Sequence, residues 1–414
     1  MEQWKEYKNT PWGIIPSHWE ISTVKNEALV VTDYVANGSF ASLADNVKYK
    51  TTKDIAVLIR LVDFNNSFKG DFIFIDEHAY EFLGKSKLFG DEIIISNVGA
   101  NVGTVFKCPY LKYKMSLAPN AIMVKFKGID NFYYHWFKSR FGQHMLQSIV
   151  TGSAQPKFNK TNFRDLHIPV PPIGEQKRIA DFLSSLDDKI ELNRQINDNL
   201  EQQAQALFNH YFVENTELLG EYDEVSLLDI ASYTNGLAMQ KYRPSEDETS
   251  YLPVMKIKEL GQGFTDSNSD ICTCNIPEIY IINSGDIIFS WSGTLMVKIW
   301  CGETAGLNQH LFKVSSESYE KWFYYFWTKY HLRKFINIAK DKAVTMGHIK
   351  REDLAKSKVL LPNQATLQNL NKIFSPIMDS IINNEIESKR QVQLRDTLLP
   401  RLMSGELKIN EINC

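Results

Sequence analysis

The sequence has few of the features that mark membrane, secreted or zinc-binding proteins. It contains no run of about 18 apolar residues, the length that a membrane-spanning helix requires. Its five cysteines are irregularly spaced and follow no secretory signal, so we expect reduced thiols in a cytoplasmic protein. Cys272 and Cys274 could form half of a metal site, but no second Cys or His pair at zinc-finger spacing accompanies them. We therefore expect no metal ion in this chain.

The chain also lacks an excess of charge of one sign. It holds 46 Lys and Arg against 49 Asp and Glu, a formal net charge of −3. Neutralising DNA phosphates requires local Lys and Arg, so this balance argues against a protein that binds nucleic acid tightly without help.

Complete catalytic motifs are absent as well. The segment 83–86 resembles the end of a phosphate-binding loop, but the first glycine of that motif is replaced by Ala79. No Asn-Pro-Pro-aromatic or glycine-rich cofactor motif occurs, so we expect that the chain cannot methylate adenine by itself. The acid–lysine groups at 187–189 and 387–389 resemble those of metal-dependent nucleases, but no upstream carboxylate cluster accompanies them. We interpret them as solvated charges on a helix face and predict a protein without catalytic residues.

What the sequence does contain is a stretch of about forty residues without proline that follows Pro172. Its apolar residues recur at steps of three and four, which is the coiled-coil pattern. The stripe consists of Ile179, Leu183, Leu186, Ile190, Leu200, Ala204, Leu207 and Tyr211, with Asn193 and Asn197 at the positions between. A helix of about 40 residues is roughly 60 Å long, so part of its apolar face needs a partner helix.

The partner lies in the same chain, because the sequence is internally duplicated. An offset of 191 residues (362 − 171) aligns Pro171 with Pro362, Ile179 with Leu370, Leu186 with Ile377, and Asn193 with Asn384. The same offset aligns the aromatic segments 132–136 and 323–327. We predict that the two helices pair antiparallel and that the stripe asparagines fix their register. The alternative is a locally frayed seam in which Ile196 takes over.

Short β-strand patterns precede each long helix. Runs rich in Val, Ile and Phe occur at 55–59, 72–75, 93–95 and 121–124, and again at 251–254, 279–282 and 287–289. The segments 90–96 and 285–290 share a Gly-Asp turn and a strand that ends in serine. The residues that follow differ, with Asn97-Val98 in one half and Trp291-Ser292 in the other. A shared framework with divergent loops is typical of two recognition modules that read different targets.

These patterns predict an α+β fold with an internal pseudo-two-fold. Two β-rich domains, 1–170 and 215–361, are joined by two long helices that pair as an antiparallel coiled coil. The helical regions are 171–214 in the centre and 362–414 at the end, the latter including a C-terminal tail.

Polar loop residues are the candidates for ligand contacts. The loops 151–160 and 340–350, each before a long helix, combine Lys with Gln, Asn, Thr or His, which contact phosphates and base edges in DNA. In the first half the candidates are Ser39, Phe40, Ser96, Asn97, Asn101, Ser153, Gln155, Lys157, Asn159 and Lys160. In the second half they are Gln240, Lys241, Arg243, Ser290, Trp291, Ser292, Thr294, Asn308, Gln309, His310, Lys342, Thr345 and His348. An ordinary solvated loop is the alternative for each.

Four segments resemble the specificity (DNA-recognition) subunit of type I restriction–modification systems. They are Trp-Gly-Ile-Ile-Pro-x-x-Trp at 12–19, Pro-x-Pro-Pro-x-x-Glu-Gln at 169–176, Thr-Met-Gly-His-Ile at 345–349, and 398–407. The resemblance follows essentially the whole chain in order. The second copy departs from it at 362–366, which lacks the Glu-Gln of the first, so the resemblance supports partner docking on the first helix more strongly than on the second.

The resemblance implies a non-catalytic, prokaryotic, cytoplasmic subunit with two target-recognition domains, each of which reads one half of a split DNA sequence. The helices would act as a spacer and as the docking site for methyltransferase subunits. The expected partners are double-stranded DNA, two methyltransferase subunits and two translocase/nuclease subunits. S-adenosylmethionine, ATP and magnesium are expected in those partners and no cofactor in this chain.

Two functions of other classes stay open from the sequence. The chain could be a coiled-coil adaptor whose β modules bind protein, or a stand-alone nuclease. Binding to genomic fragments, with and without a methyltransferase, separates the adaptor from the specificity subunit, and cleavage by the purified chain tests the nuclease.

Overall fold

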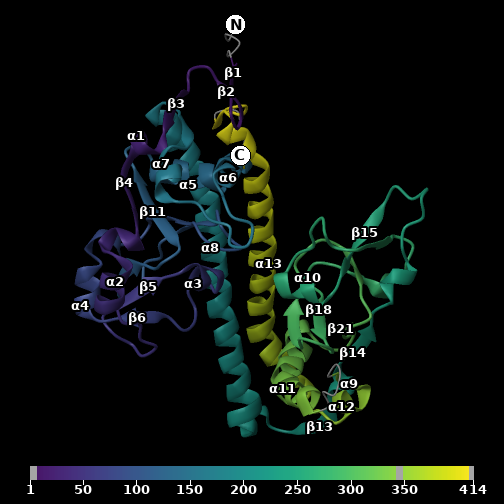
Figure 1. Ribbon diagram of the computed structural model, residues 1–414. Coiled ribbons are helices and arrows are strands. Elements are labelled where there is room, and N and C mark those ends of the chain that lie inside the picture. The colour runs from purple at the N-terminus through teal and green to yellow at the C-terminus, as the bar shows by residue number, and fades with distance from the viewer. Residues whose placement is uncertain (1–6, 342–347, 410–414) are drawn as a thin grey trace. The chain divides into compact units, whose positions relative to one another are not determined.

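The computed structural model describes residues 7–341 and 348–409. The chain forms two compact units by its internal contacts (Figure 1). Unit 1 comprises Met1–Asp187 and Gln393–Cys414, and unit 2 is the continuous segment Asp188–Val392. Within the described residues, no helix is both long and apolar enough to cross a membrane.

Unit 1 contains two four-stranded sheets. The first has the order β4-β11-β8-β9, with all neighbours antiparallel; its strands are β4 (Ala28–Asp33), β11 (Ala121–Phe126), β8 (Ile93–Ser96) and β9 (Val105–Lys107). The second has the order β6-β5-β10-β7; its strands are β6 (Ile73–Ile75), β5 (Ala56–Ile59), β10 (Lys114–Leu117) and β7 (Lys87–Leu88). In the second sheet β5 and β10 run parallel.

The apolar runs of β5 and β8 follow from burial on both faces. Side chains alternate along a strand, so Ile93 and Ile95 enter one core while Ile94 enters another. In β5, likewise, the Val57 side chain enters one core and the Leu58 side chain enters another. A strand buried on both faces needs apolar residues at every position, which is why these runs do not alternate with polar residues.

Helices and small sheets complete unit 1. The helices are α1 (Val24–Glu27), α2 (Phe40–Asn46), α3 (Leu61–Asn65), α4 (Glu77–Phe82), α5 (Asp130–Lys138), α6 (Arg140–Ser148) and α7 (Lys160–Arg164). The strand pairs are β1 (Tyr7–Thr10) with β2 (Gly13–Pro16), and β3 (Glu20–Thr23) with β12 (His167–Val170).

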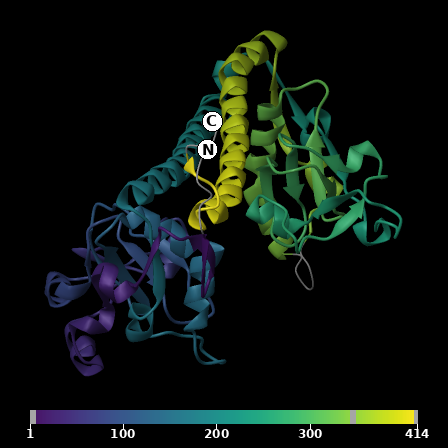
Figure 2. The same cartoon turned by 90° about the horizontal axis from the view of Figure 1, so that it is seen from above.

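Unit 2 repeats the strand order of unit 1. Its sheets are drawn in shades of green in Figures 1 and 2. Its first sheet has the order β14-β21-β18-β19, with β14 (Ser232–Asn235), β21 (Leu311–Ser315), β18 (Ile287–Ser290) and β19 (Met296–Ile299). Its second has the order β16-β15-β20-β17, with β16 (Ile271–Thr273), β15 (Tyr251–Met255), β20 (Ala305–Leu307) and β17 (Ile281–Ile282), and β15 and β20 are parallel. The remaining elements are β13 (Tyr222–Ser226) paired with β22 (Lys358–Pro362), α9 (Leu227–Ile230), α10 (Ile257–Gln262), α11 (Lys321–Asp341) and α12 (Arg351–Ala355).

The units differ where the aromatic segment becomes helical. In unit 2 it forms the single helix α11, whereas in unit 1 it is divided into α5 and α6 at Ser139. Ser139 has extended backbone, and its hydroxyl accepts a hydrogen bond from the Gly142 amide at the start of α6. A Cβ on Gly142 would lie 2.2 Å from the carbonyl oxygen of Trp136, so this close turn requires glycine.

Two long helices, α8 (Ile173–Asn209) and α13 (Gln364–Met403), contribute to both units. In unit 1, Leu183 of α8 shares a core with Leu402 of α13, and Asp187 pairs with Arg395 at 2.6 Å. In unit 2, Lys189 pairs with Glu387 at 3.1 Å. Within each unit, later residues of α8 contact earlier residues of α13, which confirms the antiparallel pairing.

The stripe asparagines form a polar layer between the two helices in unit 2. Asn193 donates to the carbonyl oxygen of Asn384 (3.3 Å) and to the carboxylate of Glu387 (2.9 Å). Asn197 donates to the carbonyl oxygen of Ile381 (3.0 Å) and accepts from the Asn384 amide (3.0 Å). Asn193 is buried and Ile196 is exposed, so Ile196 does not replace the asparagines in the seam.

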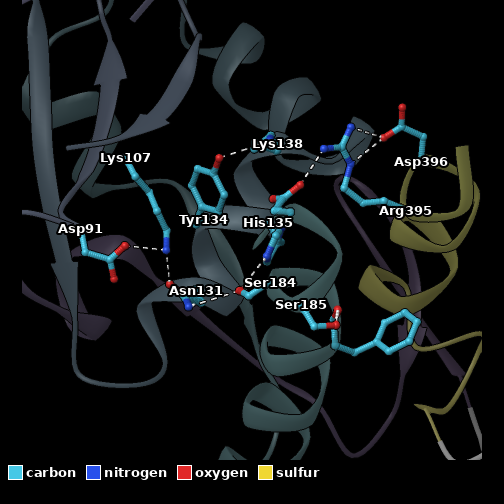
Figure 3. A network of polar contacts seen from close by, with 12 residues as sticks. Asp91, Lys107, Asn131, Tyr134, His135, Lys138, Ser184, Ser185, Arg395 and Asp396 are labelled. Atoms are coloured by element: carbon cyan, nitrogen blue, oxygen red, sulfur yellow. Dashed lines mark hydrogen bonds and ion pairs between the residues drawn. The ribbon is translucent and has the colours of Figure 1, made fainter. Parts of the chain in front are cut away.

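A polar network holds the first sheet of unit 1 against the helices (Figure 3). Lys107 donates to Asp91 (2.7 Å) and to Asn131 (2.6 Å). Both Asn131 (3.2 Å) and His135 (3.3 Å) bond to the Ser184 hydroxyl on α8. Burial lowers the pKa of His135 to about 3, so its ring is neutral at pH 7.

Candidate nucleic-acid interface

Three loops of unit 1 meet at the carboxyl end of β8. The Asn97 amide donates to the carbonyl oxygen of Asn120 (3.1 Å), and the Phe158 amide donates to the carbonyl oxygen of Asn97 (3.1 Å). The Asn97 side chain also donates to the carbonyl oxygen of Phe158 (3.0 Å), and Val98 pairs with Lys157. These contacts join the loops 96–104, 118–121 and 151–160 into one surface, which we call the junction of unit 1.

Unit 2 builds the same junction from different residues. The Trp291 amide donates to the carbonyl oxygen of His310 (3.4 Å), and the Ile349 amide donates to the carbonyl oxygen of Trp291 (3.0 Å). Ser292 pairs with His348 through the backbone, as Val98 pairs with Lys157 in unit 1. The Ser292 hydroxyl lies 3.1 Å from Nδ1 of His310. The backbone scaffold is therefore shared, and the side chains that it presents differ.

The predicted residues of unit 1 divide into those at the junction and those beside it. Asn97, Gln155 and Lys157 belong to the junction, and the side chains of Gln155 and Lys157 are exposed. Ser96 is buried at the end of β8. Ser153 and Asn101 also lie in these loops. The Ser153 side chain is exposed, and the backbone carbonyl oxygen of Asn101 accepts a hydrogen bond from the Thr104 hydroxyl.

Asn159 and Lys160 end the third loop of the junction, whereas Ser39 and Phe40 flank it. Asn159 caps the start of α7 by accepting from the Asn162 amide, and Lys160 pairs with Asp33 at 3.0 Å. Ser39 caps the start of α2, and Phe40, the first residue of that helix, is 82% exposed.

Most predicted residues of unit 2 also lie at or next to the junction. Trp291, Gln309, His310 and His348 are at least partly exposed, as is Thr294 in the loop after β18. Ser290, Ser292 and Asn308 are buried; the Ser290 hydroxyl donates to the carbonyl oxygens of Ser292 and Thr294 and so shapes this loop.

The structure does not bring Gln240, Lys241 and Arg243 to the junction. Gln240 and Arg243 line a separate polar cleft with Glu248 and Asp270, and Lys241 is exposed next to it. Lys342 and Thr345 lie outside the described residues.

Sequence reasoning missed three residues that organise these surfaces. Asn120 has a φ of 70°, which asparagine tolerates better than most residues, and its carbonyl connects two loops. Phe158 connects the loop 151–160 to Asn97. The 191-residue offset aligns Phe158 with Ile349, and this alignment could have identified it from the sequence. Asn235, the last residue of β14, accepts a hydrogen bond from the indole of Trp291, which follows β18; no local sequence pattern predicts this contact.

Among the described residues, no group of three or more His, Cys, Asp or Glu side chains could hold a metal ion. The junctions instead present amide, hydroxyl, imidazole and ammonium groups next to aromatic rings. Such a set can donate and accept hydrogen bonds on base edges and contact phosphates. The molecule therefore belongs to the class of duplicated recognition proteins. It has two β-rich units of the same fold, a pair of long helices, and loops that differ between the units on a shared backbone scaffold.

Comparison with known proteins specifies this class. The family described as type I restriction modification DNA specificity domain matches residues 33–202 and 220–395, and the chain belongs to this family. The two matched segments correspond to the two copies of the duplication.

Two of the chain's curated relatives are similar to it over nearly their whole length. It is 26% identical to the type I restriction enzyme MjaIX specificity subunit of Methanocaldococcus jannaschii, and the match covers 98% of each chain. It is 22% identical to the EcoKI specificity subunit of Escherichia coli K12, over 95% of this chain and 90% of that one. The solved S subunit of a type I system from M. genitalium has the same fold, with a TM-score of 0.55 at 15% identity over 93% of this chain and 96% of that one.

Proposed function

We propose that the chain is the sequence-specific DNA-binding subunit of a type I restriction–modification complex, in which each unit reads one half of a bipartite target through its junction. The observation that carries this is the pair of junctions, which share one backbone scaffold but present Asn97, Asn120 and Lys157 in unit 1 and Trp291, His310 and His348 in unit 2. A common scaffold positions both surfaces, and different side chains give them different targets.

Catalysis would belong to other subunits. Two methyltransferase subunits and two translocase/nuclease subunits would assemble with the chain, and S-adenosylmethionine, ATP and magnesium would bind to them. The net charge of −3 fits this division, because partner subunits can supply much of the phosphate neutralisation.

Binding with and without the methyltransferase tests the proposal. Purified chain and chain co-expressed with its methyltransferase are titrated onto genomic fragments in gel shifts. We expect selective retention of fragments that contain one bipartite sequence, strongest in the complex. Equal retention of all fragments in both preparations would contradict the proposal and favour a protein-binding adaptor.

A matched pair of lysine variants tests the junction itself. Lys157 is exposed at the junction of unit 1, whereas Lys177 is exposed on α8 and pairs with Asp181 at 2.8 Å. We expect Lys157→Ala to weaken binding to all DNA sequences and to reduce the salt slope by about 1, as loss of one phosphate contact does. Lys177→Ala should leave affinity and slope unchanged.

The helix pair would set the unread gap between the half-sites. Four residues inserted after Asn193 lengthen α8 by about 6 Å, which is nearly two base pairs at roughly 3.4 Å each. We expect the gap to grow while both half-sites stay the same. If the asparagine layer holds the original register, the insertion loops out and the gap is unchanged. A changed half-site with an unchanged gap would contradict the spacer role.

A further inference from the structure

A cleft of about 720 Å³ opens beside the junction of unit 1. One wall is formed by the junction itself, through Asn97, Val98 and the turn 119–121. The other walls come from the end of β4 with the residues after it (33–35) and from α2 with the residues after it (40–49). Its volume is in the range of sites that hold small organic ligands.

The lining of this cleft is aromatic and aliphatic. Tyr34, Phe40 and Tyr49 contribute rings, and Phe40 and Tyr49 are 82% and 53% exposed. The two charged residues of the lining are both engaged: Asp33 pairs with Lys160 at 3.0 Å, and Lys48 donates to the carbonyl oxygen of Ala44. The lining offers a phosphate one cation, Lys48, whereas it offers a flat ring the aromatic side chains of Tyr34, Phe40 and Tyr49.

The corresponding place in unit 2 can be identified from the strand register. Ala121 pairs with Ser96 and Leu311 pairs with Ser290, so the residues that follow the serines, Asn97 and Trp291, are equivalent. Ile122 pairs with Asp33 and Phe312 pairs with Asn235, so Asp33 and Asn235 are equivalent by the same register.

In unit 2 this place is filled by an indole from the protein itself. The Trp291 side chain donates to Asn235 (3.0 Å), and its ring centroid lies 5.7 Å from that of Phe312 and 6.1 Å from that of His310. In unit 1 the shorter Asn97 side chain turns to the carbonyl oxygen of Phe158 and leaves the space between Asn97 and Asp33 open. The same scaffold therefore supplies its own aromatic ring in one unit and a vacant aromatic-lined cleft in the other.

We propose that the cleft of unit 1 binds one nucleobase that has left the base stack of the target DNA. This rests on the proposed function. Enzymes that modify a base take it out of the duplex, and the base opposite then loses its pair. Aromatic side chains stack on any base, because every base has a π-face. The cleft would hold the base that has lost its pair, stacked against Phe40 and Tyr49. The loops that read the neighbouring base pairs lie next to it.

Mismatched DNA tests this inference because an extruded base reverses the usual effect of a mismatch. Breaking a pair lowers the cost of extrusion, so a mismatch at the extruded position strengthens binding, whereas a mismatch at a directly read pair weakens it. The complex with its methyltransferase is titrated with duplexes in which one mismatch is moved through each half-site. We expect one position in the first half-site at which the mismatch strengthens binding, by about tenfold.

Variants then assign this gain to the cleft. Phe40→Ala removes an exposed ring with little risk to folding, and Asn97→Trp fills the cleft as Trp291 fills its counterpart. Both should abolish the gain in the first half-site, and Phe40→Trp should keep it. The control, Phe89→Ala, removes an exposed ring of the same unit outside the cleft and should leave the first half-site gain in place.

The outcomes separate this inference from the proposed function. If the complex binds a bipartite sequence but every mismatch in the first half-site weakens binding, only the base-binding cleft is overturned. If a gain occurs but survives both Phe40→Ala and Asn97→Trp, the cleft is again overturned. If these variants impair assembly with the methyltransferase and leave the mismatch profile unchanged, the cleft binds protein instead. Absence of any sequence-specific binding would overturn the proposed function itself.

Discussion

The two units attach their first sheet to the long helices with opposite chemistry. The offset of 191 residues pairs Asn131 with Trp322, His135 with Phe326, Ser184 with Ser375, and Asp187 with Met378. In unit 1 these positions carry a hydrogen-bonded and charged network (Figure 3). In unit 2 they carry an apolar cluster in which Trp322 stacks on Phe374 with ring centroids 4.3 Å apart.

Ser375 illustrates the change most simply. Ser184 bonds to Asn131 and His135, but the equivalent Ser375 hydroxyl is buried and has no hydrogen-bond partner among the described residues. The residues equivalent to Asn131 and His135 are Trp322 and Phe326 of α11. The Trp322 indole donates to Asn371 instead, and Phe326 has no polar group to offer Ser375. The duplication has kept the geometry of this contact while its chemistry has diverged, and the following variants test how far the two solutions are equivalent.

The largest expected effect on stability comes from a truncation, because unit 1 is built from two separate chain segments and unit 2 from one. Unit 1 is completed by residues 393–409, and Leu398, Leu399, Leu402 and Met403 are buried in its core, whereas unit 2 is one continuous segment. Each buried Leu or Met contributes about 2–5 kcal/mol, and domains are stable by only about 5–15 kcal/mol. Ending the chain at Val392 should therefore unfold unit 1. Hydrogen exchange resolved by segment should show lost protection in 24–170 and retained protection in 222–340, and retained protection in both would contradict this.

The apolar cluster of unit 2 should be the more sensitive to a single truncation. Phe374 is 1% exposed and stacks on Trp322, so Phe374→Ala should cost about 3–5 kcal/mol of unfolding free energy. Ser184→Ala in unit 1 removes one hydroxyl and should cost about 1–3 kcal/mol, because two partners are left unsatisfied. Denaturant unfolding of both variants gives the comparison, and equal losses would show that the two attachments are not energetically distinct.

The ion pair of unit 1 should behave as a coupled unit. Asp187 and Arg395 are 25% and 19% exposed, and Arg395→Met would leave the Asp187 carboxylate without its partner at a cost of about 1–3 kcal/mol. Adding Asp187→Met, the residue type found at 378, should recover most of this loss. A double-mutant cycle measures the coupling; simple additivity would mean that the pair contributes nothing of its own.

The smallest effect, over the range from pH 7 to pH 5.5, is the pH dependence that His135 gives to the stability of unit 1. The pKa of His135 is lowered to about 3, chiefly by burial; among its charged neighbours Asp187 raises it, whereas Lys138, Lys107 and Arg395 lower it. Between pH 6.5 and 3 the unfolded chain binds this proton and the folded chain does not. The stabilisation is therefore complete above about pH 6.5 and falls by about 1.4 kcal/mol per pH unit below it.

His135→Phe, which copies position 326, should flatten this dependence in unit 1. Burial also lowers the pKa of His331 in unit 2, so unit 2 provides an internal control that should keep its own acid sensitivity in the variant. Hydrogen exchange at pH 7 and 5.5 resolves the two units. Unchanged acid sensitivity of unit 1 in the variant would assign the effect to other groups.

The repeated features of the fold could be predicted from the sequence, because the periodicity of apolar residues and the internal offset can both be read from it directly. The apolar stripe through Leu183 and Leu186, its copy after Pro362 and the asparagine layer all follow from spacing. The division of the helical segment at Ser139 does not, because it depends on how closely Gly142 approaches Trp136. The junctions were only partly predictable for a related reason. Which loops meet depends on backbone bonds such as Phe158 to Asn97, and whether a serine such as Ser290 faces inward depends on those loops.

The most direct test of two independent recognition units is a map of methylated adenines after exchange of one of them. Residues 25–150 are replaced by the corresponding segment of another family member, and the complex with its methyltransferase is expressed in a host whose genome is then read for methylated adenine. We predict that one half of the methylated bipartite sequence changes while the other half is retained. A change in both halves would contradict the account, because the two junctions would then read their target as a single surface.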